Sequence, residues 1–169
     1  MEPIDERLYH ALLELDWARD FCAQFGSWEE YAAHGCGFVA IKDGQVAAGA
    51  SSYTWYRGGI EIEIDTKTEY RRQGLALCCA SALLLHCLER GLYPSWDAAT
   101  PISVALAEKL GYHFSHAYPC LEIAVPTQKE DLDETEEQAA LPGCGGGLCL
   151  GLAACGARAS TEPAGGPYD

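Results

Sequence analysis

The chain has 169 residues, and 49% of them are hydrophobic, which is enough to build one domain with its own core and a further segment. Its formal net charge is -14, from 25 acidic and 11 basic residues. Because phosphate contacts need clustered lysines and arginines, this charge argues against a nucleic-acid-binding protein. It is compatible with a small cationic molecule as the partner.

The nine cysteines follow no recognisable disulfide or metal-binding pattern. No pair has CxxC spacing, and no set of cysteines and histidines has zinc-finger spacing, so we predict no metal site. Residues 1–17 are acidic and lack the basic and apolar regions of a signal peptide, and no apolar run reaches the roughly 18 residues of a membrane span. We therefore expect a cytoplasmic protein with reduced thiols and no membrane contact, while no pattern specifies its oligomeric state.

Composition changes sharply near Pro126. All four tryptophans and all four phenylalanines precede it, whereas residues 128–140 form an acidic run and the rest is rich in Gly, Ala and Cys. Such a segment cannot offset the entropy lost on ordering. We therefore predict a folded domain over residues 1–125 and a disordered tail over residues 126–169.

The chain begins with two predicted helices. Residues 4–24 carry apolar side chains at three-to-four spacing, which is typical of an amphipathic helix. Ser27 is the expected N-cap of a second, short helix, because Glu30 follows at the capping-box position. Gly35 is the expected end of that helix.

Three predicted strands follow. Residues 36–42 and 45–56 flank Asp43-Gly44, a dipeptide that is a strong signal for a hairpin turn. Residues 60–66, IEIEIDT, alternate strictly, so that isoleucines point to one face and acidic side chains to the other.

Helices and strands alternate in the remainder of the domain. Residues 74–90 are apolar nearly all round, which predicts a buried helix. A short strand over 93–98, a helix over 102–110 and a last strand over 112–125 follow. An initial hairpin with alternating helices and strands predicts an α/β domain with a mixed sheet.

The junction between the alternating strand and the buried helix is the candidate site. Gly74 lets the backbone approach a ligand closely, and the helix N-terminus offers free N–H groups and a positive partial charge. Such groups bind phosphates, and Arg71 and Arg72 add charge and donors. The alternative is an ordinary helix start with two solvated arginines. The site is neither a P-loop nor a dinucleotide fingerprint, since GxxxxGK[ST] and GxGxxG are both absent.

Four motifs in order resemble the GNAT superfamily of N-acetyltransferases. The R-x-x-G-x-A of residues 71–76 looks like that family's acetyl-CoA signature, and residues 95–114 resemble its next strand and helix, with the L-G-Y that ends it. The combination of EIDT, YRRQGLA, WDA and LAEKLGY is closest to the branch that includes the zwittermicin A resistance protein. The resemblance spans roughly residues 4–125. It implies a GNAT-like fold, a mixed and mainly antiparallel sheet flanked by helices. Since that branch usually has additional N-terminal sequence, we expect this chain to be short at its front.

The resemblance implies acetyl-CoA as the cosubstrate. In the family, backbone N–H groups of the loop hold the CoA pyrophosphate, and the main chain of the preceding strand binds the pantetheine arm. One amide of that strand is expected to polarise the thioester carbonyl, as an oxyanion hole does. The implied cofactor-binding residues are Ile62, Ile64, Thr66, Arg71, Arg72, Gln73, Gly74, Leu75 and Ala76, with Thr100 and Ser103 at the start of the following helix.

The resemblance also implies a catalytic base. Members of the family often carry a glutamate on this strand that acts through water, which implies Glu61 or Glu63. Both share a face with Asp65, so repulsion between the carboxylates is expected to raise the pKa of at least one of them. Two alternatives remain: these acids solvate one sheet face, or they attract a cationic substrate.

Trp96 and Asp97 are candidate substrate contacts, because they end a strand beside the expected cleft. A tryptophan ring attracts a cationic amine, and a carboxylate pairs with it. The alternative is that Trp96 belongs to the core and that Asp97 starts a turn.

Two positions depart from the family pattern. Thr100 stands where many relatives have asparagine, and Ala107 stands where many have a tyrosine that acts as general acid. Tyr112 is expected to pack in the last strand, and neither Tyr118 nor Tyr93 has the expected position. The sequence therefore identifies no general acid.

The predicted function is transfer of an acetyl group from acetyl-CoA to a primary amine of a small molecule. The alternative is a catalytically impaired CoA-binding or interaction module, which the departures at Thr100 and Ala107 and the acidic tail favour.

Overall fold

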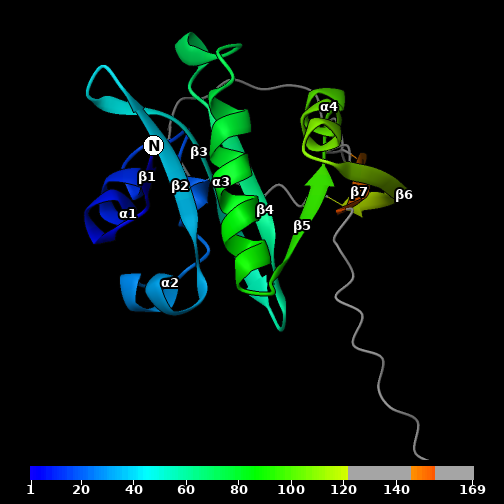
Figure 1. Ribbon diagram of the computed structural model, residues 1–169, viewed down its shortest axis with the longest axis horizontal. Coiled ribbons are helices and arrows are strands. Elements are labelled where there is room, and N and C mark those ends of the chain that lie inside the picture. The colour runs from blue at the N-terminus through cyan, green and yellow to red at the C-terminus, as the bar shows by residue number, and fades with distance from the viewer. Residues whose placement is uncertain (122–145, 155–169) are drawn as a thin grey trace, which may run out of the picture.

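The computed structural model describes residues 1–121 and 146–154. In this part of the chain, the strands form one sheet in the order β1-β2-β3-β4-β5-β7-β6 (Figure 1). Among the strands of these described ranges, only β4 and β5 are parallel neighbours, and all other neighbours are antiparallel. The predicted mixed, mainly antiparallel sheet is thereby confirmed. The strands are β1 (Glu2–Pro3), β2 (Gly37–Lys42), β3 (Gln45–Tyr56), β4 (Gly59–Thr66), β5 (Tyr93–Ala98), β6 (Tyr112–Leu121) and β7 (Gly146–Ala154).

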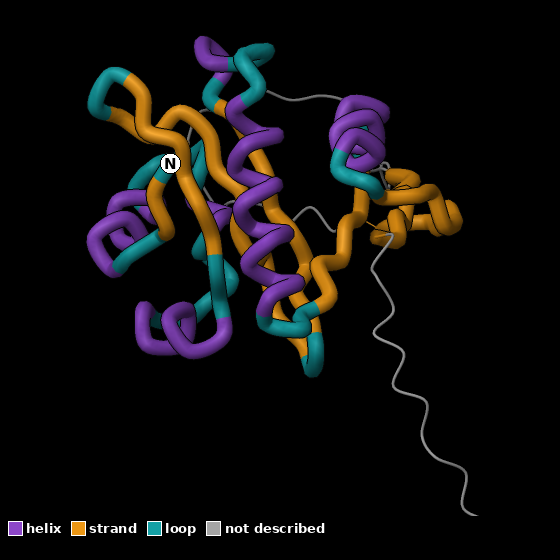
Figure 2. The backbone as a smooth tube through the Cα atoms, viewed as in Figure 1, coloured by secondary structure: helices purple, strands orange, loops and turns teal. Residues whose placement is uncertain are grey.

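Helices flank the sheet on both faces, and α3 runs lengthwise along it (Figure 2). One core cluster lies between α3 and the sheet, and a second lies between the opposite face and the N-terminal helices. Successive side chains of a strand point to opposite faces, so β2 supplies Ala40 to the first cluster and Val39 to the second. The helical elements are α1 (Glu6–Leu13), η1 (Arg19–Phe21), α2 (Trp28–His34), η2 (Thr68–Tyr70), α3 (Leu75–Glu89) and α4 (Pro101–Lys109).

The single helix predicted over residues 4–24 is wrong. α1 ends at Leu13, and η1 begins only at Arg19. The break turns the chain so that Ala18, Phe21 and Cys22 are buried against the same cluster as α1. Tertiary packing therefore outweighs the helical periodicity of the segment.

Local signals placed the next elements correctly. The Ser27 side chain accepts a hydrogen bond from the Glu30 N–H at 3.3 Å and caps α2. The predicted hairpin is β2 and β3, which turn at Asp43 and Gly44, both with positive φ. A bulge between Ser52 and Thr54 interrupts the register between β3 and β4.

The strand predicted over residues 60–66 is β4, and its alternation is confirmed. Ile60 and Ile62 are buried in the cluster under α3, with Ile64 packed against it. The acidic residues between them point to the opposite face, where η1 also lies. Glu61 and Glu63 are only partly exposed, which matters for their chemistry.

The helix predicted over residues 74–90 is α3, but it is not buried all round. Cys79, Ala80 and Leu83 lie against the sheet, whereas Leu85 and Leu88 are 61% and 54% exposed. The prediction of complete burial rests on the apolar side chains that α3 carries on every face. In the described part of the chain only one face of α3 is covered.

The disorder predicted for the tail does not hold for Gly146–Ala154. These residues form β7, which pairs with β5 on one side and β6 on the other. Leu148, Leu150 and Leu152 alternate with small residues, a period of two that the high glycine content masked. The domain predicted to end at residue 125 therefore receives a strand from beyond that boundary, and the other tail residues lie outside the described ranges. Within the described ranges, no helix has the length and apolar character needed to cross a membrane.

Ser51 joins the hairpin to η1 and α2. Its side chain is fully buried, donates to the Phe21 carbonyl at 2.7 Å and lies 2.8 Å from the Tyr31 hydroxyl. When alanine replaces Ser51, the Phe21 carbonyl and the Tyr31 hydroxyl lose this hydrogen-bond partner. We therefore expect a loss of about 2 kcal/mol in the free energy of unfolding. Urea denaturation measures this loss.

The matched control is Ser115→Ala, since Ser115 is exposed on β6. It is expected to change the free energy of unfolding by less than about 0.5 kcal/mol. Equal midpoints for the two variants would contradict a structural role for the Ser51 hydroxyl.

Candidate functional site

The junction predicted from sequence is a loop that leads from β4 into α3. Arg72 and Gly74 both have positive φ, at 61° and 78°, and Gly74 is the N-cap of α3. Among the described residues no side chain caps this helix, and the N–H groups of its first turn have no partner within the helix. A side chain added at Gly74 would meet nothing within 4 Å. The arrangement leaves donors of positive partial charge open at a left-handed turn, the geometry in which backbone binds phosphates.

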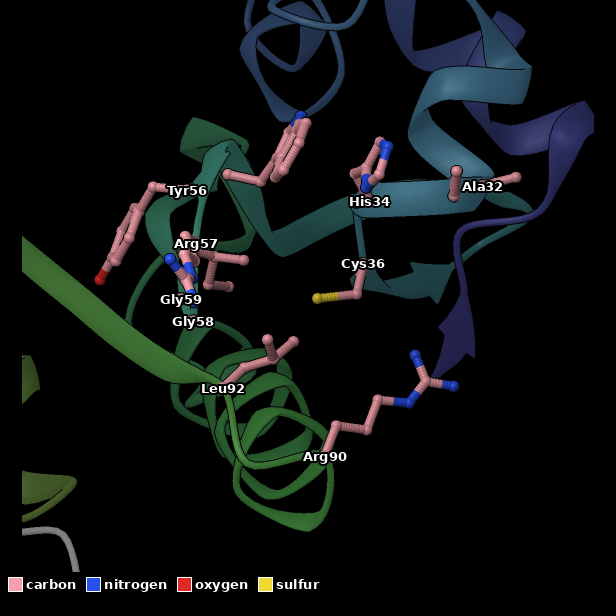
Figure 3. Close-up of a pocket in the computed structure, with 13 residues that line it drawn as sticks. Ala32, His34, Cys36, Tyr56, Arg57, Gly58, Gly59, Arg90 and Leu92 are labelled. Atoms are coloured by element: carbon pink, nitrogen blue, oxygen red, sulfur yellow. The ribbon is translucent and has the colours of Figure 1, made fainter.

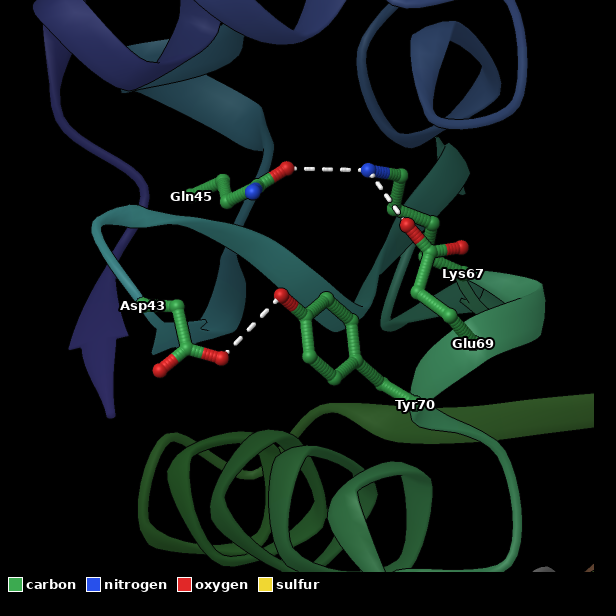
Figure 4. A network of polar contacts seen from close by, with 5 residues as sticks. All are labelled: Asp43, Gln45, Lys67, Glu69 and Tyr70. Carbon is green, nitrogen blue, oxygen red and sulfur yellow. Dashed lines mark hydrogen bonds and ion pairs between the residues drawn. The ribbon is translucent and has the colours of Figure 1, made fainter.

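The β2–β3 hairpin holds this loop from the side (Figure 4). The Tyr70 hydroxyl donates to Asp43 at 3.3 Å, and Lys67 bridges Gln45 at 2.9 Å and Glu69 at 2.7 Å. These contacts hold residues 67–70, which lead into the loop before the open N–H groups of α3.

Lys42, at the end of β2, adds a second connection between the hairpin and the loop. Its ammonium group donates to the Gln73 side chain and lies 5.5 Å from the centre of the Tyr70 ring. A cation thus lies beside the predicted phosphate position, although no sequence pattern singles out Lys42.

The two arginines of the loop have different surroundings. Arg71 donates from Nε to the Thr66 carbonyl at 3.1 Å and lies 3.7 Å from Asp65. Arg72 is exposed, and among the described residues it has no ion pair. Arg71 therefore stabilises the loop, and Arg72 is the guanidinium group that is open to a ligand.

A gap opens between β4 and β5 beside this loop. The two strands pair only at Gly59↔Tyr93, Ile60↔Pro94 and Glu61↔Ser95. Beyond that point β5 turns toward α4 and away from β4 (Figure 1). The Asp97 N–H, which would continue the ladder, instead donates to the Glu61 carboxylate at 3.0 Å.

The orientation of β4 shows which main-chain groups face the gap. The Gly58 carbonyl accepts from the Tyr93 N–H at 2.8 Å, so even-numbered residues direct their backbone groups toward β5. Ile62 and Ile64 therefore present main-chain groups at the gap. The Thr66 N–H donates to the Asp65 side chain at 2.6 Å, so this N–H, predicted to bind the cofactor, already has a partner.

The carboxyl groups on the acidic face of β4 differ in their pKa values. Burial raises the pKa of Glu63 to about 7, and the charges of Asp20 and Asp65 act in the same direction. Burial also raises the pKa of Glu61, but hydrogen bonds from Ser95 and from the Asp97 N–H oppose the shift. Glu63 is therefore the carboxylate on this strand that is poised to exchange a proton near neutral pH.

Asp97 and Trp96 point in opposite directions from β5. Asp97 is exposed and accepts a hydrogen bond from the Tyr118 hydroxyl, which raises the pKa of Tyr118 to about 12. Trp96 is 2% exposed, donates to the Ser103 hydroxyl at 2.9 Å and packs edge-to-face on Tyr112. This is the position of a core side chain, the alternative that the sequence left open for Trp96.

The start of α4 uses both of its predicted cofactor residues for structure. The Thr100 hydroxyl caps the helix by accepting from the Ser103 N–H at 3.2 Å, while the Ser103 hydroxyl accepts from Trp96. Ala107 is fully buried, and Tyr112 is buried with its hydroxyl on the Pro94 carbonyl at 2.8 Å. Neither position can supply a proton to the gap.

A profile of the GNAT acetyltransferase family matches residues 1–121. The chain belongs to this family. The uncharacterized N-acetyltransferase YdfB of Bacillus subtilis (strain 168) is 36% identical over 90 residues, which cover 52% of this chain and 34% of YdfB. A GCN5-related N-acetyltransferase-like protein from Streptococcus suis 89/1591 superposes with a TM-score of 0.67 at 50% identity, over 68% of this chain and 46% of that protein. This GNAT chain thus spans between a third and a half of the length of these two relatives.

A more distant structure shares the GNAT fold over most of the length. The protein yncA from Salmonella typhimurium, solved with its cofactor acetyl-CoA, has a TM-score of 0.56 at 16% identity. The match covers 91% of this chain and 87% of yncA.

The structure brings most of the sequence-predicted residues into one region. The loop, the backbone of β4 and the two glutamates surround the gap between β4 and β5. Sequence reasoning missed Asp20, which reaches the acidic face only because the chain breaks after α1. It also missed Lys42, since only the hairpin brings that residue to the loop.

Proposed function

We propose that the protein is an acetyl-CoA-dependent N-acetyltransferase whose acceptor is a primary amine of a small molecule. The observation that carries this proposal is the uncapped start of α3 at Gly74, next to the point where β4 and β5 separate. In this assignment the open N–H groups and Arg72 hold the pyrophosphate, as the sequence signature implies. The acetyl-CoA bound by yncA supports the choice of cosubstrate.

The pantetheine arm follows the gap beside β4 in this proposal. Ile62 and Ile64 face it with main-chain groups, which can extend the strand-like hydrogen bonding that β5 no longer supplies. An N–H group there would also stabilise negative charge on the thioester oxygen as the amine attacks. Binding in this position holds the thioester next to the acidic face, and proximity alone lowers the barrier to aminolysis substantially.

Glu63 is the proposed general base. An amine must lose its proton before or during attack, and a carboxylate with a pKa of about 7 is a suitable acceptor at neutral pH. Glu61 has a different role in this assignment: its carboxylate holds the Asp97 N–H and so links β5 to β4 at the mouth of the gap. Asp97 and Glu63 both add negative charge, which favours a cationic amine as the substrate.

The reaction does not require an acid at Ala107. A thiol has a pKa of about 8.5, so the CoA thiolate can leave without a proton on sulfur. Tyr118 keeps its proton at neutral pH, but that proton is directed to Asp97.

Free-thiol release from acetyl-CoA across a panel of amines tests the activity. We expect turnover with small cationic amines, and little with anionic or neutral acceptors, because the acidic face attracts positive charge. Calorimetry with acetyl-CoA and CoA on the same preparation measures binding. Acetyl-CoA binding without turnover of any amine would favour the alternative, a CoA-binding or interaction module, whereas loss of both would overturn the cofactor assignment.

Two finer points belong to this proposal. The motifs EIDT, YRRQGLA and WDA support a place in the branch that includes the zwittermicin A resistance protein. A cytoplasmic location also stays a prediction.

A further inference from the structure

A cavity of about 370 Å³ lies at the end of the sheet opposite the Gly74 loop. Its walls come from the end of α2, the turn between β3 and β4, the start of β4 and the residues after α3 (Figure 3). β4 begins at Gly59 in the cavity wall and ends at Thr66 before the loop, so the whole strand separates the two places. No residue of the proposed acetyl-CoA site lines this cavity.

The cavity has a charge opposite to that of the chain. Its lining includes Arg57 and Arg90 but no aspartate or glutamate, although acidic residues outnumber basic ones by 25 to 11 in the chain. Arg57 and Arg90 lie on opposite sides of the space (Figure 3). In the ranges that the structure describes, neither guanidinium group forms an ion pair. Arg19 and Arg72 also form no ion pair in those ranges, so what distinguishes Arg57 and Arg90 is that they line one space together, an arrangement that favours an anionic ligand.

Cys36 also lines the cavity, and its thiol lies within the influence of the Arg90 charge. Its side chain points into the space between the walls (Figure 3). The pKa of this thiol is lowered by a hydrogen bond with Cys87 and by the charge of Arg90, against the effect of burial. The positive charge of Arg90 therefore extends to the cavity wall.

The remaining walls are flat and apolar. The rings of His34 and Trp55 stack with centroids 3.9 Å apart and planes 11° from parallel. Ile60 and Leu92 complete the apolar lining. At Gly59 a side chain would come within 2.4 Å of the Tyr56 hydroxyl and the Tyr93 carbonyl, so the chain is packed closely here and only glycine fits. The volume is at the lower end of the range of ligand pockets, which fits a small molecule.

We propose that this cavity binds a small organic anion with a flat apolar body, an aromatic carboxylate, whose charge lies between Arg57 and Arg90 and whose ring packs beside the His34–Trp55 pair. The proposal is independent of acetyl transfer, because it uses other residues at the other end of β4.

Calorimetry on the full chain tests both halves of the proposal with three probes. Benzoate carries the charge and the ring, acetate carries only the charge, and benzyl alcohol carries only the ring. Benzoate is expected to bind about fivefold more tightly than either, because an ion pair with exposed arginines and burial of the ring each contribute about 1 kcal/mol. Equal affinity for benzoate and acetate, or no heat with benzoate, would overturn it.

Single variants locate the binding. Arg57→Gln and Arg90→Gln are each expected to weaken benzoate about fivefold. Both side chains are exposed, so their loss should leave the fold intact. Arg19→Gln is the matched control, since Arg19 is an exposed arginine on η1 outside the cavity. Equal weakening by all three variants would indicate non-specific attraction and contradict the assignment.

Cys36 supplies a readout that does not depend on binding heat. Benzoate that occupies the cavity should slow alkylation of Cys36, as peptide mass spectrometry can measure, while exposed Cys78 on α3 should react at an unchanged rate. Unchanged alkylation of Cys36 at saturating benzoate would place the ligand elsewhere and overturn the proposal. Acetyl-CoA binding, measured in parallel, should be unchanged by Arg57→Gln and Arg90→Gln, which distinguishes a failure here from a failure of the proposed function.

Discussion

Replacement of Gly74 by glutamate is expected to abolish acetyl-CoA binding, with a loss of at least about 100-fold in affinity. Gly74 is the N-cap of α3, and the space around its Cα is open. In the proposed complex that space belongs to the pyrophosphate, so a glutamate there fills it and places a negative charge beside phosphate oxygens. The expected loss corresponds to about 3 kcal/mol, the size of one or two charge-assisted hydrogen bonds.

The control for this substitution must separate charge at the site from backbone strain. Gly74 has a φ of 78°, so any side chain there costs roughly 1 kcal/mol of stability irrespective of ligand. Gly91 has a φ of 69° and open space as well, but it follows the other end of α3. Gly91→Glu should therefore lower the melting temperature as much as Gly74→Glu does while it retains acetyl-CoA binding in calorimetry.

The same comparison shows how the proposal fails. If Gly74→Glu binds acetyl-CoA as tightly as the unaltered protein, the start of α3 is not the phosphate site. Equal losses of affinity in Gly74→Glu and Gly91→Glu would attribute the effect to destabilisation instead.

Sequence reasoning located the loop because its signals are local. An alternating strand, an Arg-rich connection and a glycine before an apolar run specify adjacent backbone, and β4, the loop and α3 follow within one residue of the predicted bounds. The hairpin at Asp43-Gly44 was predictable for the same reason. Where neighbouring residues in the sequence determine the backbone conformation, the sequence pattern is sufficient to predict the element.

The break after α1 and the position of β7 depend on packing between residues distant in sequence, which is why sequence patterns do not predict them. Nothing within residues 4–24 marks the break after Leu13, because burial of Phe21 against the opposite sheet face imposes it. The same break brings Asp20 near Glu63 and so affects a pKa at a residue far along the chain. β7 is a comparable case, since its place between β5 and β6 depends on strands distant in sequence.

The site contains two pairs of like residues, Arg71 with Arg72 and Glu61 with Glu63, and only the structure shows that the members of each pair differ in their surroundings. Arg71 and Arg72 are neighbours of identical chemistry, yet one bonds the Thr66 carbonyl and the other is open. Glu61 and Glu63 share a face, yet the divergence of β5 gives the first an N–H donor and leaves the second near other carboxylates. Alternation predicts which face a side chain takes, whereas its partners depend on the neighbouring strands.

Glu63→Gln is expected to lower kcat about 100-fold or more, because a general base contributes at least this factor. For the unaltered protein, activity should rise with pH through about 7, as the Glu63 carboxyl loses its proton and becomes able to accept one from the amine. The variant should lack this limb of the pH profile. Asp20→Asn supplies the specific control: removal of a neighbouring negative charge lowers the pKa of Glu63, so the limb should move to lower pH with little change in the plateau.

Stability should change in the opposite direction from activity. The pKa of Glu63 is raised on folding from the roughly 4.3 of an unfolded chain to about 7, so between these values the folded state holds a proton that the unfolded state has lost. The free energy of unfolding therefore falls as pH rises from about 4 to 7, and above pH 7 the buried, ionised carboxylate destabilises the fold. Glutamine removes that penalty, so Glu63→Gln should be more stable by about 2 kcal/mol at pH 8 and equally stable at pH 4, as urea denaturation can measure.

Glu89→Gln, at the exposed end of α3, should change neither stability nor the pH profile. A Glu63→Gln variant that keeps the full kcat and the limb near pH 7 would exclude Glu63 as the base, whereas loss of activity without the gain in stability would mean that its carboxyl is not held protonated by the fold.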